Sequence, residues 1–267
     1  MPPYAAVRMD DLGELTPVPA FSQDLDAVLG GQATMTTGTF RAVTFDAGGT
    51  LLHWSTEERL RFGECCRRAG IVVSPSAARD GARACARCFR ESPPSPAAVA
   101  TDEWWLRYHA AGLRAAGVSG DIDVLSQRMQ HAGKSGEDKW VFDQDVPEVL
   151  DILLTKGLTL AVVSNADGTL AERFRTLGIA DRFAYIADSA VVGVRKPDPE
   201  IYWVTCRRIG IPPSACLHVG DRVDADAGVA LAAGATPVIY DPLDVLPDDH
   251  RRIRRLLDVV SLVSCSP

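Results

Sequence analysis

The stretch AVTFDAGGTLL, residues 42–52, decides how the rest of the chain is interpreted. An apolar run rich in β-branched residues ends at one acidic residue, Asp46, and two glycines and a threonine follow it. Such a run predicts a buried strand over residues 41–46, and the glycines predict a tight turn after it. A carboxylate at the tip of a buried strand is a candidate catalytic group, because ligands of α/β proteins bind outside the carboxyl ends of the strands.

Strand patterns and helix patterns alternate from residue 144 to the C-terminus. Strands are predicted at LTLAVVSN, FAYIADS, ACLHVGD and ATPVIY, and the segments between them have the apolar spacing and glycine ends of helices. Near-continuous apolar strands separated by helices indicate a parallel sheet covered on both faces. The last segment, RRIRRLLDVVSLV at residues 251–263, is compatible with one helix or with a strand followed by a helix.

Residues 56–143 contain helix signals and no strand signal. Helices are predicted at 56–69, 76–91, 101–116 and 121–132, and the prolines of ESPPSPAA predict a loop between two of them. The fold prediction is therefore α/β, with a Rossmann-like parallel sheet core at residues 39–54 and 144–267 and an inserted all-helical domain at residues 55–143. Residues 1–38 are rich in Pro, Gly, Ala and Thr and are predicted to be a loosely ordered extension.

The composition argues against several classes of function. The 267 residues carry a net charge of −7, which speaks against a nucleic-acid-binding surface. No apolar run approaches the ~20 residues of a membrane span, and no signal peptide is visible. The seven cysteines indicate reduced thiols in a cytoplasmic protein. Cys85 and Cys88 are interpreted as small apolar residues on a helix rather than as a redox or metal pair.

Polar residues gather at the predicted strand ends and just before one helix. The set comprises Asp46, Ser164, Asn165, Lys196, Asp221 and Asp226. Carboxylate oxygens suit Mg²⁺, whereas an ammonium group, a hydroxyl group and backbone N–H groups suit phosphate oxygens. Each residue alone could be a turn former, a helix cap or a solvated charge. Gathered at one edge of a parallel sheet, they predict a site for Mg²⁺ and phosphate.

Four segments resemble, in order and spacing, the motifs of the haloacid dehalogenase superfamily. They are FDAGGTLL (45–52), VVSNADG (162–168), RKPDPEIY (195–202) and HVGDRVDADAGVALAAG (218–234). The resemblance extends over residues 41–245. The helical insertion after the first segment resembles the cap domain of the subfamily with an α-helical cap.

The resemblance implies catalytic roles for three of these residues. Asp46 would be the nucleophile that attacks phosphorus. Ser164 would hydrogen-bond the phosphoryl group, and Lys196 would balance the charge between nucleophile and phosphate. The other residues that the resemblance places around the substrate are Asn165, Gly49 and Thr50, with Thr50 steadying the loop.

The resemblance also implies a Mg²⁺ site. Asp46, the carbonyl oxygen of Gly48 and Asp221 would be ligands. Asp226 would bind the ion directly or through water. Asp224 is the competing acid, because it lies close to Asp226 in register.

Position 48 departs from the pattern of phosphatases in this superfamily. They normally carry a second aspartate two residues after the nucleophile, which protonates the leaving group, and here that residue is Gly48. General acid–base catalysis typically contributes ~10²–10⁴-fold, so its loss needs an explanation. His53, or less readily His109 or His131, could supply the proton. Alternatively, the substrate has a good leaving group, as an acyl phosphate does, or donates its own proton.

Two further interpretations give the chain a different function. The relatives that cleave carbon–halogen bonds also lack the second aspartate and use no metal, but this chain keeps Asp221. A phosphonate hydrolase would need a lysine in the insertion, where Lys134 and Lys139 stand. The chain could also be a phosphate-binding module without catalytic activity. We predict a Mg²⁺-dependent hydrolase of a small phosphorylated metabolite, resembling a sugar or cyclitol phosphate, with no nucleic-acid or membrane partner.

Overall fold

The computed structural model describes residues 7–9, 15–17, 39–54, 58–91, 102–134, 140–246 and 251–263. Near the N-terminus, strands β1 (Val7–Met9) and β2 (Leu15–Pro17) form a two-stranded antiparallel sheet. The rest of the predicted extension and the predicted loop ESPPSPAA, apart from its first residue, lie outside the described residues. From residue 39 onward the described chain divides into two compact units, 39–52 with 142–241 and 251–263, and 53–141 with 242–246.

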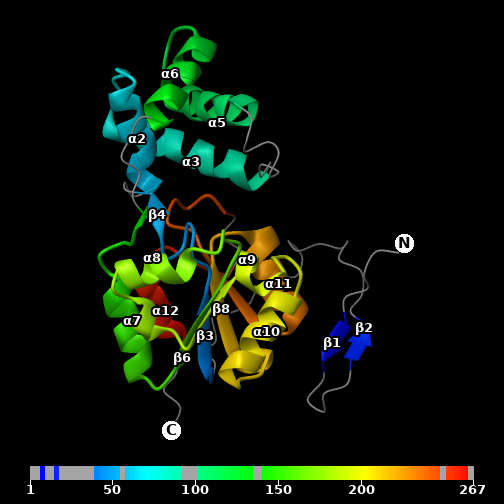
Figure 1. Cartoon of the computed structure of the whole chain (residues 1–267). Coiled ribbons are helices and arrows are strands. Elements are labelled where there is room, and N and C mark those ends of the chain that lie inside the picture. The colour runs from blue at the N-terminus through cyan, green and yellow to red at the C-terminus, as the bar shows by residue number, and fades with distance from the viewer. Residues whose placement is uncertain are drawn as a thin grey trace. The chain divides into compact units, whose positions relative to one another are not determined.

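The first unit is built on a six-stranded parallel sheet, which confirms the predicted α/β fold class (Figure 1). The strand order is β10-β9-β8-β3-β6-β7, and every neighbouring pair is parallel. The strands are β3 (Ala42–Phe45), β6 (Thr159–Ser164), β7 (Tyr185–Asp188), β8 (Cys216–Gly220), β9 (Thr236–Tyr240) and β10 (Arg252–Ile253). All residues of β3 and β8 are buried, as expected of strands covered on both faces.

Helices cover both faces of this sheet (Figure 1). They are α7 (Val146–Thr155), α8 (Leu170–Thr176), α9 (Ser189–Val192), α10 (Glu200–Ile209), α11 (Gly228–Ala233) and α12 (Val259–Leu262). Helices α10 and α11 pack together over one face, where their apolar side chains join those of the strands in one core cluster. Helices α7 and α12 pack together on the other side. The ambiguous C-terminal segment is a strand, β10, followed by α12.

The central position of β3 brings the strand ends together. Phe45, its last residue, is paired with Val162 of β6 on one side and with Val219 of β8 on the other. Because all three strands run in the same direction, the residues that follow them emerge at the same edge of the sheet. From β3 the chain continues to β6 on one side of the sheet and returns to β8 on the other. In open α/β sheets, ligands bind at such a reversal of strand order, outside the carboxyl ends of the strands.

The second unit is helical. It contains α2 (Glu58–Arg68), α3 (Pro75–Glu91), α5 (Asp102–Ala115) and α6 (Ile122–Lys134), which match the four predicted helices. A short antiparallel pair, β4 (His53–Trp54) and β5 (Trp140–Val141), was not predicted, because two-residue strands leave no alternating pattern. None of the described helices is both long enough and apolar enough to cross a membrane.

The cysteines of the helical unit behave as apolar core residues. Cys66 and Cys85 are buried, and all cysteines in the described part of the chain are free thiols. Burial raises the pKa of the Cys66 thiol to about 12, and burial also raises the pKa of Cys85 well above its usual range. Since the thiolate is the reactive form, these thiols are inert at neutral pH.

The helices of this unit approach one another closely around Phe62. A Cβ atom added to Gly81 of α3 would lie 2.2 Å from the Phe62 ring, and one added to Gly112 of α5 would lie 2.4 Å from it. The ring is 5% exposed. The two glycines therefore give the aromatic ring the space in which it packs.

We expect Gly81→Ala to lower the free energy of unfolding by about 1–3 kcal/mol, although alanine has the higher helix propensity, because the methyl group overlaps the Phe62 ring. Urea unfolding followed by circular dichroism measures the change. The double variant Gly81→Ala/Phe62→Leu should recover part of the loss, since the smaller side chain frees the space. A Gly81→Ala protein as stable as the wild type would contradict this packing.

Candidate active site

The loop after β3 is wound around one carbonyl group. The Ala47 carbonyl oxygen accepts hydrogen bonds from the backbone N–H groups of residues 50–52, at 3.3, 2.9 and 2.7 Å. Gly49 supplies the turn with a φ of +85°, a left-handed conformation that residues with a side chain rarely adopt. Asp46, which directly precedes this turn, is 6% exposed at the end of the central strand.

Two glycines make room for two of the acids. A Cβ atom on Gly49 would lie 2.7 Å from Asp221 Oδ2, and one on Gly220 would lie 2.3 Å from Asp226 Cγ. A side chain at either position would therefore displace a carboxylate. Gly48 is different: it is exposed, its φ is not left-handed, and an added Cβ would meet no described atom within 4 Å.

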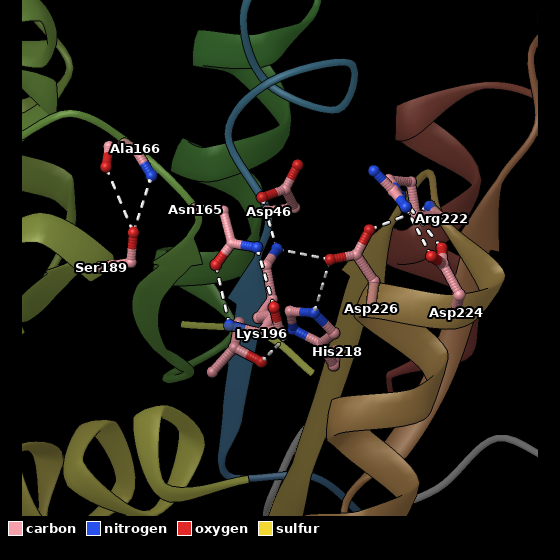
Figure 2. Close-up of polar contacts among 10 residues, drawn as sticks. Asp46, Asn165, Ala166, Ser189, Lys196, His218, Arg222, Asp224 and Asp226 are labelled. Atoms are coloured by element: carbon pink, nitrogen blue, oxygen red, sulfur yellow. Dashed lines mark hydrogen bonds and ion pairs between the residues drawn. The ribbon is translucent and has the colours of Figure 1, made fainter. Parts of the chain in front are cut away.

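One buried ammonium group joins two of the acids. Lys196 Nζ lies 2.6 Å from Asp46 Oδ1 and 2.5 Å from Asp226 Oδ1 (Figure 2). The side chains of all three residues are less than one-tenth exposed. Asp226 Oδ2 also accepts a hydrogen bond of 2.9 Å from the backbone N–H of Arg222. Charge-assisted hydrogen bonds of this kind are stronger than those between neutral groups.

The charges of this cluster shift one another's pKa values. Burial raises the pKa of Asp46, and Lys196 opposes that rise without cancelling it. Burial would also raise the pKa of Asp226, but Lys196 and His218 hold that pKa well below its usual range. Burial would lower the pKa of Lys196, but Asp226 and Asp46 hold it above its usual range. The ammonium and the Asp226 carboxylate are therefore charged at neutral pH.

The acids are grouped closely enough to hold a metal ion. One carboxylate oxygen each of Asp46, Asp221 and Asp226 lies within 4.8 Å of the other two. Three carboxylates fit a hard divalent cation such as Mg²⁺ or Ca²⁺, which take oxygen ligands. Because both oxygens of Asp226 already accept hydrogen bonds, Asp46 and Asp221 are better placed as direct ligands. Asp224, the competing acid, is exposed and pairs with Arg222 instead.

The other predicted residues stand at the same edge of the sheet. Ser164 ends β6 and is 4% exposed. Thr50 is buried, and its Oγ1 has no hydrogen-bond partner among the described residues. Asn165 is exposed, yet its side-chain amide bonds to the backbone of Lys196 through both of its polar atoms.

The comparison with protein families agrees with this geometry. Residues 40–234 match the family model of haloacid dehalogenase-like hydrolases. The chain belongs to the haloacid dehalogenase-like hydrolase family. The match covers the central strand, the inserted helices and every residue of the acidic cluster, so the resemblance of the four sequence segments is confirmed.

The proteins similar to this hydrolase include one that is named for its domain and one that is named for its reaction. It is 28% identical over 227 residues to human haloacid dehalogenase-like hydrolase domain-containing protein 3, with 79% of this chain and 88% of that protein covered. The segments SNAD and HVGD and the tryptophan pair of DEWWLRY also resemble that type of protein. A phosphoserine phosphatase from Thermus thermophilus is 28% identical over 223 residues, with 75% of this chain and 88% of that protein covered.

The fold is also shared with a dehalogenase of known structure, so it does not distinguish phosphatases from dehalogenases. That structure superposes with a TM-score of 0.51 at 19% identity, and covers 86% of this hydrolase and 99% of the dehalogenase. At this identity the likeness concerns the fold alone. The choice between reactions therefore depends on the side chains of the site.

Sequence reasoning missed a polar chain beneath the site. His218 Nδ1 lies 2.9 Å from Thr44 Oγ1, which lies 2.7 Å from the Tyr202 hydroxyl. All three residues are buried, and His218 Nε2 lies 3.8 Å from Asp226 Oδ1 (Figure 2). A threonine and a histidine inside otherwise apolar strand patterns were the available signal, because buried polar groups need partners.

Two residues at the end of β7 brace the loop after β6, and these were missed as well. Ser189 Oγ bonds both the N–H and the carbonyl group of Ala166, each at 3.2 Å. The Asp188 carboxylate accepts hydrogen bonds from Gly168 N–H and Leu170 N–H. No local pattern reveals this brace, because it joins two separate strand ends.

The alternative proton donors and the two lysines of the helical insertion belong to the other unit. His53 is the first residue of β4, and His109 and His131 lie on α5 and α6. Lys134 ends α6, and Lys139 lies outside the described residues. Every residue of the acidic cluster belongs to the sheet unit.

We expect Asp221→Ala to weaken Mg²⁺ binding at least about tenfold, because the substitution removes one of three clustered carboxylates. Isothermal titration calorimetry measures the affinity. Asp224→Ala is the matched control: it removes a nearby exposed acid outside the cluster and should leave the affinity within about twofold of the wild type. Equal weakening by the two variants would contradict the assignment.

Proposed function

We propose that this hydrolase cleaves phosphate monoesters with Asp46 as the nucleophile. The observation that carries the proposal is the contact of 2.6 Å between Asp46 Oδ1 and Lys196 Nζ, beside Asp221 and Asp226. The ammonium group offsets part of the negative charge that would repel an anionic phosphoryl group. Membership of the family and the similarity to a phosphoserine phosphatase support the same reaction.

In the proposed reaction an Asp46 carboxylate oxygen attacks phosphorus. The bond between phosphorus and the leaving oxygen breaks, and its electron pair leaves with that oxygen. Water then attacks the aspartyl-phosphate and releases inorganic phosphate and the free carboxylate. Lys196 keeps its proton throughout and stabilises the charge on the transferred group. Ser164 donates a hydrogen bond from its hydroxyl group to a phosphoryl oxygen.

The proposed metal site uses Asp46, the Gly48 carbonyl oxygen and Asp221, with Asp226 bound directly or through water. When bound, Mg²⁺ would supply positive charge for the phosphoryl oxygens. The Asp221 carboxylate occupies the space that a Cβ atom on Gly49 would need, which supports this set because it brings Asp221 to the loop that carries Asp46. This acidic cluster also favours phosphoryl transfer over hydrolysis of a carbon–halogen bond, which in this superfamily uses no metal.

We expect Asp46→Asn to abolish turnover and to leave the fold intact. The amide is nearly isosteric but cannot attack phosphorus. Because burial raises the pKa of Asp46, the charged form is disfavoured in the folded protein, and the neutral amide should not lower the melting temperature. Phosphate release and thermal unfolding measure the two effects. Asp151→Asn, an exposed aspartate on α7, is the matched control and should keep full activity. Substantial activity in Asp46→Asn would rule out covalent catalysis by this residue.

The site has no acid at position 48, although the backbone has room for one. Gly48 is exposed, and an added Cβ would meet no described atom within 4 Å. Among the described residues, no steric contact therefore explains the glycine. A site without an acid there suits a leaving group that is stable without protonation, or a substrate that supplies its own proton. An alkyl phosphate has a strongly basic leaving oxygen and would react slowly.

We expect a steep dependence of kcat/KM on the pKa of the leaving group in the wild type. Gly48→Asp should flatten that dependence and raise activity on alkyl phosphates by up to ~10²-fold, because the new carboxyl group can protonate the leaving oxygen. A series of aryl and alkyl phosphates measures both. Gly48→Asn is the control, since it has the same size without an acidic proton. Equal gains in the two variants, or a flat wild-type dependence, would contradict the missing-acid explanation, and His53→Ala would then be the next variant.

The proposed substrate is a small phosphorylated metabolite that resembles a sugar or cyclitol phosphate, with the helical unit as the cap that selects it. A screen of phosphorylated metabolites with and without Mg²⁺, in which phosphate and chloride release are followed together, tests this. Phosphate release that requires Mg²⁺ supports the proposal. Halide release without metal, or tight binding without turnover, would replace it with the dehalogenase or the binding-module function.

A further inference from the structure

The side chain of Asn165 is engaged with the backbone of Lys196. Asn165 Nδ2 donates to the Lys196 carbonyl oxygen at 3.0 Å, and Lys196 N–H donates to Asn165 Oδ1 at 2.8 Å (Figure 2). Both polar atoms of the amide are used by the same residue, so the orientation of the amide is set by Lys196. The carbonyl oxygen of the amide and one of its two N–H groups are therefore engaged with Lys196.

Lys196 is held at both of its ends. Its backbone is bonded to Asn165, and its ammonium group bonds Asp46 and Asp226 in the buried part of the site. A free lysine side chain has many rotamers, so a fixed backbone position restricts where its charge can lie. The position of the Lys196 backbone therefore influences the distance from the ammonium group to the nucleophile.

Asn165 is itself carried by an anchored loop. Ser189 Oγ bonds the N–H and the carbonyl group of the next residue, Ala166, each at 3.2 Å (Figure 2). Asp188 bonds Gly168 N–H two residues further on. Both anchors come from the end of β7 and do not involve Lys196. The loop after β6 is thus held in place independently of Lys196, and Asn165 of this loop hydrogen-bonds the backbone of the lysine.

We propose that Asn165 is a positioning residue that acts on the reaction through Lys196. It ties the lysine backbone to the end of β6 and so holds the ammonium group between Asp46 and Asp226. This assignment is an alternative to the substrate-binding role that the sequence predicted for Asn165, and kinetics separate the two. Its kinetic consequences rest on the proposed phosphatase function, whereas its effect on Lys196 does not.

A double-mutant cycle tests how Asn165 acts. Asn165→Ala should lower kcat on an aryl phosphate about 10- to 100-fold and leave KM within about twofold, because misplaced catalytic groups reduce transition-state stabilisation. In a Lys196→Met background the same substitution should change kcat by less than about twofold. Thr169→Ala, a control in the same loop whose hydroxyl bonds only Asp167 among the described residues, should leave kcat unchanged. Equal losses in both backgrounds, or a raised KM with unchanged kcat, would show direct substrate binding and overturn the proposal.

Acetylation of lysines followed by mass spectrometry tests, without any substrate, whether the hydrogen bonds from Asn165 hold Lys196 in place. Lys196 is buried between two carboxylates and should react slowly in the wild type. In Asn165→Ala we expect its labelling rate to rise at least about fivefold, while Lys156, on α7's C-terminal cap, keeps its rate as an internal control. An unchanged rate at Lys196 overturns the proposal even if the protein is an active phosphatase. A raised rate supports it even if no phosphate ester is turned over.

Discussion

The buried contact of the Lys196 ammonium group with Asp46 and Asp226 is the interaction on which the rest of this site depends. Burial of charge is strongly unfavourable unless partners compensate it, and one cation between two carboxylates compensates them only in part. With Asp221 included, the ionised cluster keeps an excess of negative charge. That excess gives a divalent cation a physical reason to bind. Burial, together with the nearby charge of Asp226, raises the pKa of Asp46 although an ammonium group lies beside it.

The surrounding structure holds these charges at close range. Parallel strands deliver Asp46, Ser164 and Asp221 to one edge of the sheet, and Gly49 and Gly220 leave the volume that the acids fill. Hydrogen bonds from Ser189 and Asp188 fix the loop after β6, and Asn165 connects that loop to Lys196. Preorganised polar groups of this kind need little rearrangement when charge develops in a reaction.

The fold and the reaction are separate questions in this family, because a dehalogenase shares the fold of this chain. The acidic cluster favours the proposed phosphoryl transfer over carbon–halogen hydrolysis. The open space at Gly48 bears instead on which leaving groups the proposed substrate can have. A glycine there is not required by the backbone. In the proposed reaction, the leaving group, the substrate or a residue outside the acidic cluster would then have to meet the need for a proton.

The sequence by itself determined the α/β class, the helical insertion and the strand-end residues, because apolar periodicity and residues next to a strand are local properties. It favoured Asp226 over Asp224, but no local pattern decided between them. The structure shows that Asp226 contacts Lys196, 30 residues away, whereas Asp224 is exposed and pairs with Arg222. The sequence also could not show that the amide of Asn165 bonds the Lys196 backbone, 31 residues away. The bracing by Asp188 and Ser189 was likewise hidden, and for the chain from Tyr202 to His218 the sequence offered only two polar residues without their partners. Only tertiary structure decided these contacts, because each depends on how separate strands and helices pack, and no short segment encodes that geometry.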